Sequence, residues 1–230
     1  MTGPDDSSPS SVFLLPDFRY AFRMDPRHRM VAEQIRARGV VDRRVLDAMT
    51  KVPREIFIPE GARGEAYEDH PVPIGHGVTI SQPYIVGYMT EALKLEPSHR
   101  ALEIGTGCGY QTAVLAELAA RVYSIEVIPE LAARARATID SLGYVNVAIR
   151  TGDGHYGWPE EAPFDRILGA AAATEVPSAL VEQLAVGGIM VLPIERTLGW
   201  QELQVLRKHE GSVETLSTLP VRFVPMIRKV

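Results

Sequence analysis

Glycine recurs at alternate positions in one short segment of the sequence, Ile104-Gly105-Thr106-Gly107-Cys108-Gly109-Tyr110. The segment follows an apolar run and precedes a helical pattern, so it joins a strand to a helix. Such a turn lies at the carboxyl end of a strand in an open α/β sheet, where ligands bind. Because glycine has no side chain, Gly105 and Gly107 let a ligand approach the backbone closely. The loop therefore predicts a ligand site, although a tight turn without a ligand would use the same residues.

Acidic residues accompany the ends of three predicted strands. Glu103 directly precedes the glycine loop, Glu126 closes the next strand, and Asp153 follows the third. Each acid alone is common as a helix cap or a solvated loop residue. Successive strand ends, however, meet at one edge of a parallel sheet. We therefore predict that the three acids surround one ligand.

The spacing and the acids together indicate the chemistry of that ligand. The loop reads G-x-G-x-G, whereas dinucleotide-binding folds use G-x-G-x-x-G. Glu103 would repel a pyrophosphate but attract a cationic amino-acid group. Glu126 can accept hydrogen bonds from ribose hydroxyls, and Asp153, followed by Gly154, can meet an adenine amino group. S-adenosyl-L-methionine, which leaves S-adenosyl-L-homocysteine as product, is a nucleoside with an ammonium, a sulfonium and no phosphate, so the pattern favours it over NAD.

The elements that would position these residues alternate between strand and helix from residue 100 onward. The order predicts an α/β fold, a doubly wound and mostly parallel sheet with helices on both faces. Residues 202–206 and 221–226, with a turn at Glu210-Gly211, predict antiparallel strands at the end of the chain. The predicted elements of the alternating part are strands at 101–104, 122–125, 145–149, 164–171 and 189–192, and helices at 110–119, 130–142 and from Pro177 to Gly187-Gly188.

The chain before residue 100 predicts helices and loops. One helix carries Met30, Val31 and Ile35 and ends at Gly39, and Asp42 is the expected N-cap of the next. A loop-rich stretch from Pro53 to Gly77 follows, and a third helix starts after Ser81-Gln82-Pro83. We therefore expect a flexible arm over residues 1–25 and a single domain over 26–230, made of a helical and loop cap (26–99) and a Rossmann-like core (100–230).

Composition limits the partners of the protein. The 230 residues carry a formal net charge of −5 without basic runs, which disfavours nucleic acid. No apolar run approaches the roughly 20 residues that span a bilayer, so no membrane contact is expected. The single cysteine, Cys108, excludes an internal disulfide, and the histidines lack metal-binding spacing. We expect a cytoplasmic monomer without a bound metal.

Several segments occur in an order that resembles the protein-L-isoaspartate O-methyltransferase family, from about Met30 to Ile227. The most specific are Thr79-Ile80-Ser81-Gln82-Pro83, in the stretch Pro73 to Pro83, and Gly157-Trp158-Pro159. The remaining matches are Glu103 to Tyr110, Tyr123 to Glu126, Gly152 to Gly154, Pro163 to Asp165, and Val221 to Pro225.

This resemblance implies a seven-stranded class I methyltransferase fold with an active-site serine at Ser81. It implies methylation of the free α-carboxylate of L-isoaspartyl residues in damaged proteins and peptides, with D-aspartyl residues as a further substrate class. The ester would then close to a succinimide without enzyme, which starts repair. The implied cofactor contacts are Val78, Thr79, Ile80, Ser81, Glu103, Gly105, Gly107, Glu126, Val127, Asp153 and Gly154.

Such a reaction needs no catalytic base. An α-carboxyl group has a pKa of about 3.3–3.7, so it is already ionised at neutral pH. Catalysis then depends on alignment of the reacting groups and exclusion of water. Ser81 would hydrogen-bond the substrate carboxylate or shape the pocket, while a simpler interpretation makes it the N-cap of the helix that begins near Pro83.

Three other functions fit parts of the pattern. Glu195-Arg196-Thr197 departs from the family pattern and leaves open a related carboxyl methyltransferase for another peptide or a small acid. A nucleoside-binding module without catalysis is a second alternative, which the intact Ser81, Glu103 and Glu126 disfavour. A dehydrogenase is a third, disfavoured by the glycine spacing and the acids.

Overall fold

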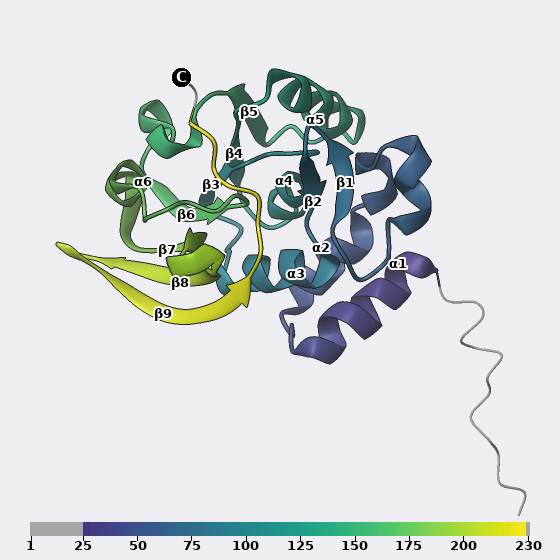
Figure 1. Cartoon of the computed structure of the whole chain (residues 1–230), viewed down its shortest axis with the longest axis horizontal. Coiled ribbons are helices and arrows are strands. Elements are labelled where there is room, and N and C mark those ends of the chain that lie inside the picture. Colours follow the sequence, from purple (N-terminus) through teal and green to yellow (C-terminus); the bar gives the residue numbers. More distant parts are fainter. Residues whose placement is uncertain (1–24, 229–230) are drawn as a thin grey trace, which may run out of the picture.

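A computed structural model describes residues 25–228 of the chain. The predicted arm, residues 1–25, lies outside the described residues apart from Asp25, whose side chain caps the first helix. None of the helices in the described region is long and apolar enough to cross a membrane. The fold centres on one large sheet, with a helical N-terminal part packed at one side (Figure 1).

The sheet has seven strands in the order β5-β4-β3-β6-β7-β8-β9. Strands β3 to β7 pair in parallel, and β7, β8 and β9 pair antiparallel. This arrangement confirms the predicted class I methyltransferase fold. The strands are β3 (Arg100–Ile104), β4 (Arg121–Glu126), β5 (Val147–Thr151), β6 (Phe164–Gly169), β7 (Leu184–Glu195), β8 (Gln201–His209) and β9 (Ser212–Val221).

Alternation along the strands divides the core into two layers, one on each face of the sheet. Ala101 and Val122 belong to one buried cluster, while the next residues, Leu102 and Tyr123, belong to the other. Successive side chains of a strand point to opposite faces, so both faces of the sheet are covered. The covering helices are α3 (Pro83–Ala92), α4 (Tyr110–Ala116) and α5 (Pro129–Ser141), which contribute to the first cluster, and α6 (Ser178–Gln183), which contributes to the second.

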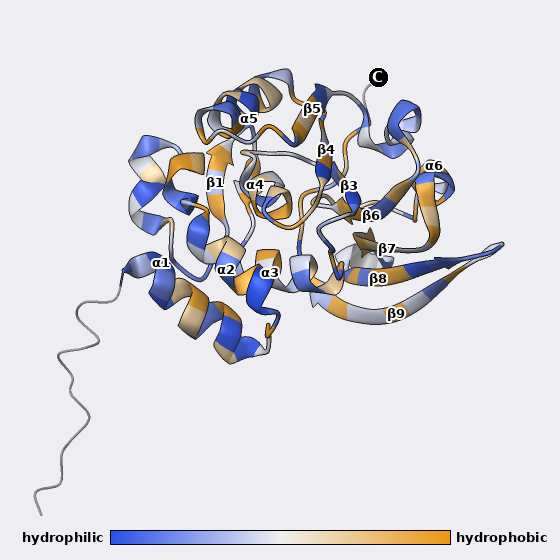
Figure 2. Ribbon diagram, turned by 180° about the vertical axis from the view of Figure 1, so that it is seen from behind, coloured by the Kyte–Doolittle hydropathy of each residue, from blue (hydrophilic) through white to orange (hydrophobic). Residues whose placement is uncertain are grey.

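The N-terminal part follows its sequence signals closely. Gly39 ends the first helical stretch with φ 98°, a conformation that glycine adopts without strain. Asp42 caps the next helix by accepting a hydrogen bond from the Arg44 amide. Hydrophobic and hydrophilic residues alternate along this part of the chain (Figure 2), and its buried residues include Ile35 of the first helical stretch and Met49 of the second. The elements are α1 (Pro26–Arg29), the π-helix η2 (Met30–Ile35), the 3-10 helix η3 (Arg36–Arg38) and α2 (Arg43–Lys51).

The stretch predicted to be loop-rich, from Pro53 to Gly77, contains more regular structure than expected. It holds the 3-10 helices η4 (Arg54–Phe57) and η5 (Glu60–Glu65) and the strand β1 (Val72–Gly75). β1 pairs antiparallel with β2 (Val78–Ile80), and the two strands form a small separate sheet. These elements escape a search for periodicity because each spans no more than two helical turns or two strand repeats.

Several expected boundaries are wrong. Helix α6 ends at Gln183 instead of reaching Gly187-Gly188, and β7 begins at Leu184. The glycine pair lies in an irregularity of β7, where Leu184 pairs with Phe164 and the next partner of β6, Arg166, pairs with Ile189. The predicted strand 221–226 is also wrong, since β9 spans Ser212–Val221. Smaller shifts affect the other ends: the helix predicted to reach residue 119 ends at Ala116, β6 ends at Gly169, and β5 starts at Val147.

Candidate active site

A pocket lies at the carboxyl edge of the parallel strands, where β3 and β4 end. Strand ends supply Ile104, Ile125 and Glu126 to its lining. The rest of the lining comes from segments far apart in the sequence: Val78 to Ser81, Val86 and Met89, Gly105 to Cys108, Tyr110 and Gln111, Val127, Ile128 and Leu131, Gly154, Ala170 and Ala171, and Val224 to Ile227.

The glycine loop takes its shape from three residues with a left-handed backbone conformation. Gly105, Gly107 and Gly109 have φ values of 91°, 55° and 92°, which residues with side chains adopt only with strain. Backbone amides of Gly105 and Thr106 donate to the Ile125 carbonyl at 2.8 and 3.2 Å, so the loop is held against β4. The loop thus presents backbone instead of side chains to the pocket at Gly105 and Gly107.

Glu126 lines the pocket and also holds its walls together. Its Oε2 accepts a hydrogen bond from the Gly107 amide at 2.7 Å, and its Oε1 accepts one from the Ile128 amide at 3.0 Å. The residue is 5% exposed. A carboxylate has about four acceptor positions, so two remain for hydroxyl groups of a ligand.

The segment Val78 to Ser81, which precedes the large sheet in the sequence, forms another wall of the pocket. β2 ends at Ile80, and α3 begins at Pro83 with Gln82 in the N-cap position and no side-chain cap. The interpretation of Ser81 as the N-cap of this helix is therefore wrong. Ser81 instead lies in the pocket lining, half-buried, and its carbonyl accepts a hydrogen bond from Arg54.

The side chain of Glu103 is not part of the pocket lining. It is 0% exposed, and its Oε2 accepts hydrogen bonds from Thr112 at 2.5 Å and Ser124 at 2.6 Å. Its Oε1 is buried without a partner. Burial raises the pKa of Glu103 to about 7, although the two hydroxyl donors act in the opposite direction. Contact between Glu103 and a cofactor ammonium remains a prediction.

Asp153 also lies outside the pocket lining, although its neighbour Gly154 belongs to it. Its Oδ1 accepts from the His155 amide at 2.9 Å and lies 2.8 Å from the His155 ring Nδ1. The carboxylate therefore caps the short helix η6 (Gly154–Tyr156). A contact from Asp153 to adenine stays a prediction, and the pairing with His155 was not expected from the sequence.

Sequence reasoning missed two contributors to the site. The C-terminal segment 224–227 crosses the sheet edge after β9 (Figure 1), where the Ala172 amide donates to the Val224 carbonyl at 2.8 Å. Its match to the family pattern was the available signal. Buried Arg54 had no such signal, since it lies in the stretch predicted as loop. The exposed loop of Glu195, Arg196 and Thr197 lies outside the pocket lining, with Arg196 paired to Glu202 at 3.0 Å.

The lining suits a nucleoside that carries no phosphate. Glu126 is the acidic side chain of the lining, most of the other lining residues are apolar, and no Lys, Arg or His of the described residues belongs to the lining. A pyrophosphate would find backbone amides but no cation, whereas ribose hydroxyls would find the Glu126 carboxylate. The described residues also contain no group of three side chains placed to hold a metal ion.

The sheet and the pocket at the glycine loop define a class I methyltransferase that uses S-adenosyl-L-methionine. Comparison with known proteins gives the family. The family model for protein-L-isoaspartate(D-aspartate) O-methyltransferase matches residues 26–230, and the chain belongs to this family.

Curated relatives carry the same family name. The chain is 51% identical over 200 residues to the protein-L-isoaspartate O-methyltransferase of Gloeobacter violaceus, covering 87% of this chain and 98% of that protein. It is 55% identical over 204 residues to protein-L-isoaspartate O-methyltransferase 2 of Marinobacter nauticus, covering 88% and 93%.

Solved structures agree with these relatives. One protein-L-isoaspartate O-methyltransferase is 30% identical with a TM-score of 0.80, and the match covers 86% of this chain but 65% of that chain. A Plasmodium falciparum structure described under the same enzyme name, in complex with S-adenosyl-L-homocysteine, is 28% identical with a TM-score of 0.76. That match covers 90% of this chain and all of the other.

We expect Glu126→Ala to weaken the affinity for S-adenosyl-L-homocysteine by about 1–3 kcal/mol, the cost of unpaired buried polar groups. Titration calorimetry measures the affinity, and thermal unfolding reports how much the loss of the Gly107 and Ile128 bonds disturbs the loop. Glu130→Ala, an exposed acid on α5, is the control. Unchanged affinity in a folded Glu126→Ala variant would remove this residue from the ribose role.

Glu103 should make stability depend on pH. Its pKa rises on folding from about 4.5 to about 7, so the folded state keeps a proton that the unfolded state releases. The free energy of unfolding should therefore fall as pH rises from about 5 to 7, by at most about 3 kcal/mol from this group. Glu103→Gln, a neutral residue of the same shape, should lack this contribution. Urea unfolding at pH 5 and 7.5 measures it, and parallel pH dependences of the two proteins would contradict it.

Proposed function

We propose that the protein transfers the methyl group of S-adenosyl-L-methionine to the free α-carboxylate of L-isoaspartyl residues in damaged proteins and peptides. The observation that carries this proposal is the pocket in which the glycine loop and Glu126 face the segment Val78 to Ser81. That segment contains the family's most specific sequence match, and the family model covers the chain from residue 26 to its end.

The pocket residues have distinct roles in this proposal. Glu126 would hold the ribose, and the bare backbone at Gly105 and Gly107 would admit the amino-acid part of the cofactor. Val78, Thr79, Ile80, Val127 and Gly154 would form the walls around the cofactor, and Ser81 would orient the substrate carboxylate. When bound, S-adenosyl-L-methionine supplies a methyl group made electrophilic by the sulfonium charge.

The chain need not provide a general base for this chemistry. An α-carboxylate is ionised at neutral pH, and no histidine of the described residues lies in the pocket lining. The apolar walls and the C-terminal segment 224–227 would exclude water and align the reactants. The product ester would close to a succinimide without help, and hydrolysis would return part of it to aspartate.

The remaining expectations form part of the same proposal. Residues 26–230 would act as one methyltransferase domain, with 26–99 as its cap and 100–230 as its core. The protein would work as a monomer in the cytoplasm, without nucleic acid or membrane as a partner. Sedimentation of the purified full chain tests the monomer.

A pair of peptides tests the function directly. One contains an L-isoaspartyl residue and the other an aspartyl residue at the same position. With labelled methyl donor, we expect transfer only to the isoaspartyl peptide, counted as ester plus released methanol because the ester is unstable. A D-aspartyl version shows whether that residue is also a substrate. Equal transfer to the aspartyl peptide, or transfer only to small acids, would favour the related carboxyl methyltransferase instead.

Ser81→Ala should lower kcat/KM for the isoaspartyl peptide about tenfold, since it removes one hydrogen bond to a charged group. The Kd for S-adenosyl-L-homocysteine should stay within a few-fold of that of the unaltered protein. Ser178→Ala, at an exposed position on α6, is the matched control. A rate equal to that of the unaltered protein would assign the catalytic alignment to other residues.

A further inference from the structure

Arg54 is a fully buried arginine (0% exposed) directly behind the pocket wall. Its Nη2 donates to the Ser81 carbonyl at 2.7 Å, and its Nε donates to the Ala66 carbonyl at 2.7 Å. Its guanidinium carbon lies 4.8 Å from the centroid of the Tyr110 ring. Ser81 and Tyr110 both line the pocket, so Arg54 touches the wall from behind without entering it.

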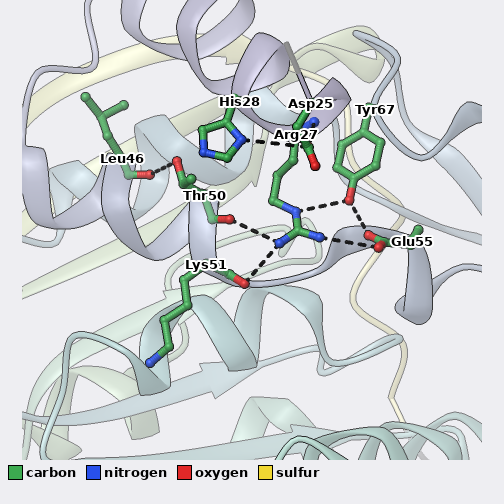
Figure 3. A network of polar contacts seen from close by, with 8 residues as sticks. All are labelled: Asp25, Arg27, His28, Leu46, Thr50, Lys51, Glu55 and Tyr67. Atoms are coloured by element: carbon green, nitrogen blue, oxygen red, sulfur yellow. Dashed lines mark hydrogen bonds and ion pairs between the residues drawn. The ribbon is translucent and has the colours of Figure 1, made fainter. Parts of the chain in front are cut away.

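A polar network fixes the helix that carries Arg54. Arg54 begins η4, and the next residue, Glu55, accepts hydrogen bonds from the Tyr67 hydroxyl and from Arg27 (Figure 3). Arg27 also donates to the carbonyls of Thr50 and Lys51, both at 3.3 Å, near the end of α2. Glu55 is hydrogen-bonded to Tyr67, and Arg54 is hydrogen-bonded to Ala66. Two adjacent residues of η4 are therefore bonded to the two residues that follow η5 in the sequence. The helical cap therefore holds the guanidinium in a fixed place.

The charge of Arg54 is not balanced by a carboxylate. Its contacts are two backbone carbonyls and an aromatic ring, and no ion pair within residues 25–228 includes it. Its Nη1 is buried without a partner. Burial lowers the pKa of Arg54, but a guanidinium remains charged near neutral pH. An unpaired buried cation is costly, and an anion bound in the adjacent pocket would offset part of that cost.

We propose that Arg54 is a positioning and specificity residue: it fixes the backbone of Ser81, and its unbalanced charge favours a carboxylate over a neutral group at the substrate end of the pocket. This inference rests on the proposed function, which supplies the anionic substrate. It gives the pocket a preference for negative charge without placing a cation in its lining. Because Arg54 is not part of the lining, the cationic cofactor would not contact its guanidinium directly.

The test compares two ligands and three variants. The ligands are the isoaspartyl peptide and the same peptide with its free α-carboxyl converted to a carboxamide. Titration calorimetry with S-adenosyl-L-homocysteine present gives both affinities and their ratio. The variants are Arg54→Lys, which keeps the charge, and Arg54→Gln and Arg54→Met, which remove it.

We expect the unaltered protein to prefer the carboxylate, and the preference to fall about tenfold in the Gln and Met variants. Arg54→Lys should keep most of the preference while its kcat falls, because an ammonium cannot reach both carbonyls as the guanidinium fork does. A purely structural role would weaken both ligands equally and leave their ratio unchanged. If Arg54→Met does not fold, Arg54→Gln, which retains a hydrogen-bond donor, decides the result.

Arg166 provides the matched control. Like Arg54, it donates to backbone carbonyls, those of Leu93, Lys94 and Asp165, but it lies outside the pocket lining. Arg166→Met should lower the melting temperature without changing the ratio. An unchanged ratio in folded Arg54→Gln overturns the inference, as does a wild-type protein without preference for the carboxylate. Failure of the unaltered protein to methylate the isoaspartyl peptide would instead reject the proposed function.

Discussion

The attachment of the glycine loop to the end of β4 is the constraint on which the pocket depends. Amides at Gly105 and Thr106 donate to the Ile125 carbonyl, and the Gly107 amide donates to the Glu126 side chain. These bonds require left-handed backbone at the loop glycines, which a residue with Cβ would adopt only with strain. The same carboxylate that shapes the loop faces the pocket. Under the proposed function, loop geometry and ligand recognition would therefore be coupled through this one side chain.

A buried polar layer under the loop supports this arrangement. Glu103 accepts from Thr112 of α4 and from Ser124 of β4, and Ser124 also lies 2.6 Å from the Thr106 hydroxyl. The layer thus joins the loop, a strand and a helix by hydrogen bonds in a region of low dielectric, where such bonds are strong and unmatched groups costly. Burial of the Glu103 carboxyl raises its pKa to about 7, and its Oε1 is the oxygen left without a partner.

The sequence predicted the features that local chemistry determines. The parallel strands, the Asp42 cap, the helix end at Gly39 and the position of the glycine loop all follow from local patterns, and the structure contains them. Strand alternation places Glu103 on the same face as Ala101, whose buried cluster includes residues of α4, and Glu103 accepts a hydrogen bond from Thr112 of that helix. The expectation relied instead on its nearness to the strand end.

Long-range contacts determine the parts that the sequence did not predict. The segment after β9 was predicted as a strand from its apolar residues, but it pairs with Ala172 through one isolated bridge, in which the Ala172 amide donates to Val224 and the Met226 amide donates to Ala172. Helix α6 stops at Gln183. The side chain of Gln183 is hydrogen-bonded to the backbone of Tyr156 and Trp158, which lie 27 and 25 residues earlier in the sequence. Such partners leave no periodic signal at the residue itself.

The electrostatics of the pocket follow from which charges are in the lining and which lie behind it. Glu126 lines the pocket, whereas Arg54 lies outside the lining and donates to the carbonyl of Ser81, which belongs to it. A cation in the lining would pair with Glu126 and remove the acceptor that a nucleoside needs. A cation behind the wall avoids that pairing and would still attract a substrate anion, because screening by water is weak in a buried region. This separation of charges would suit a site that binds a cationic cofactor beside an anionic substrate.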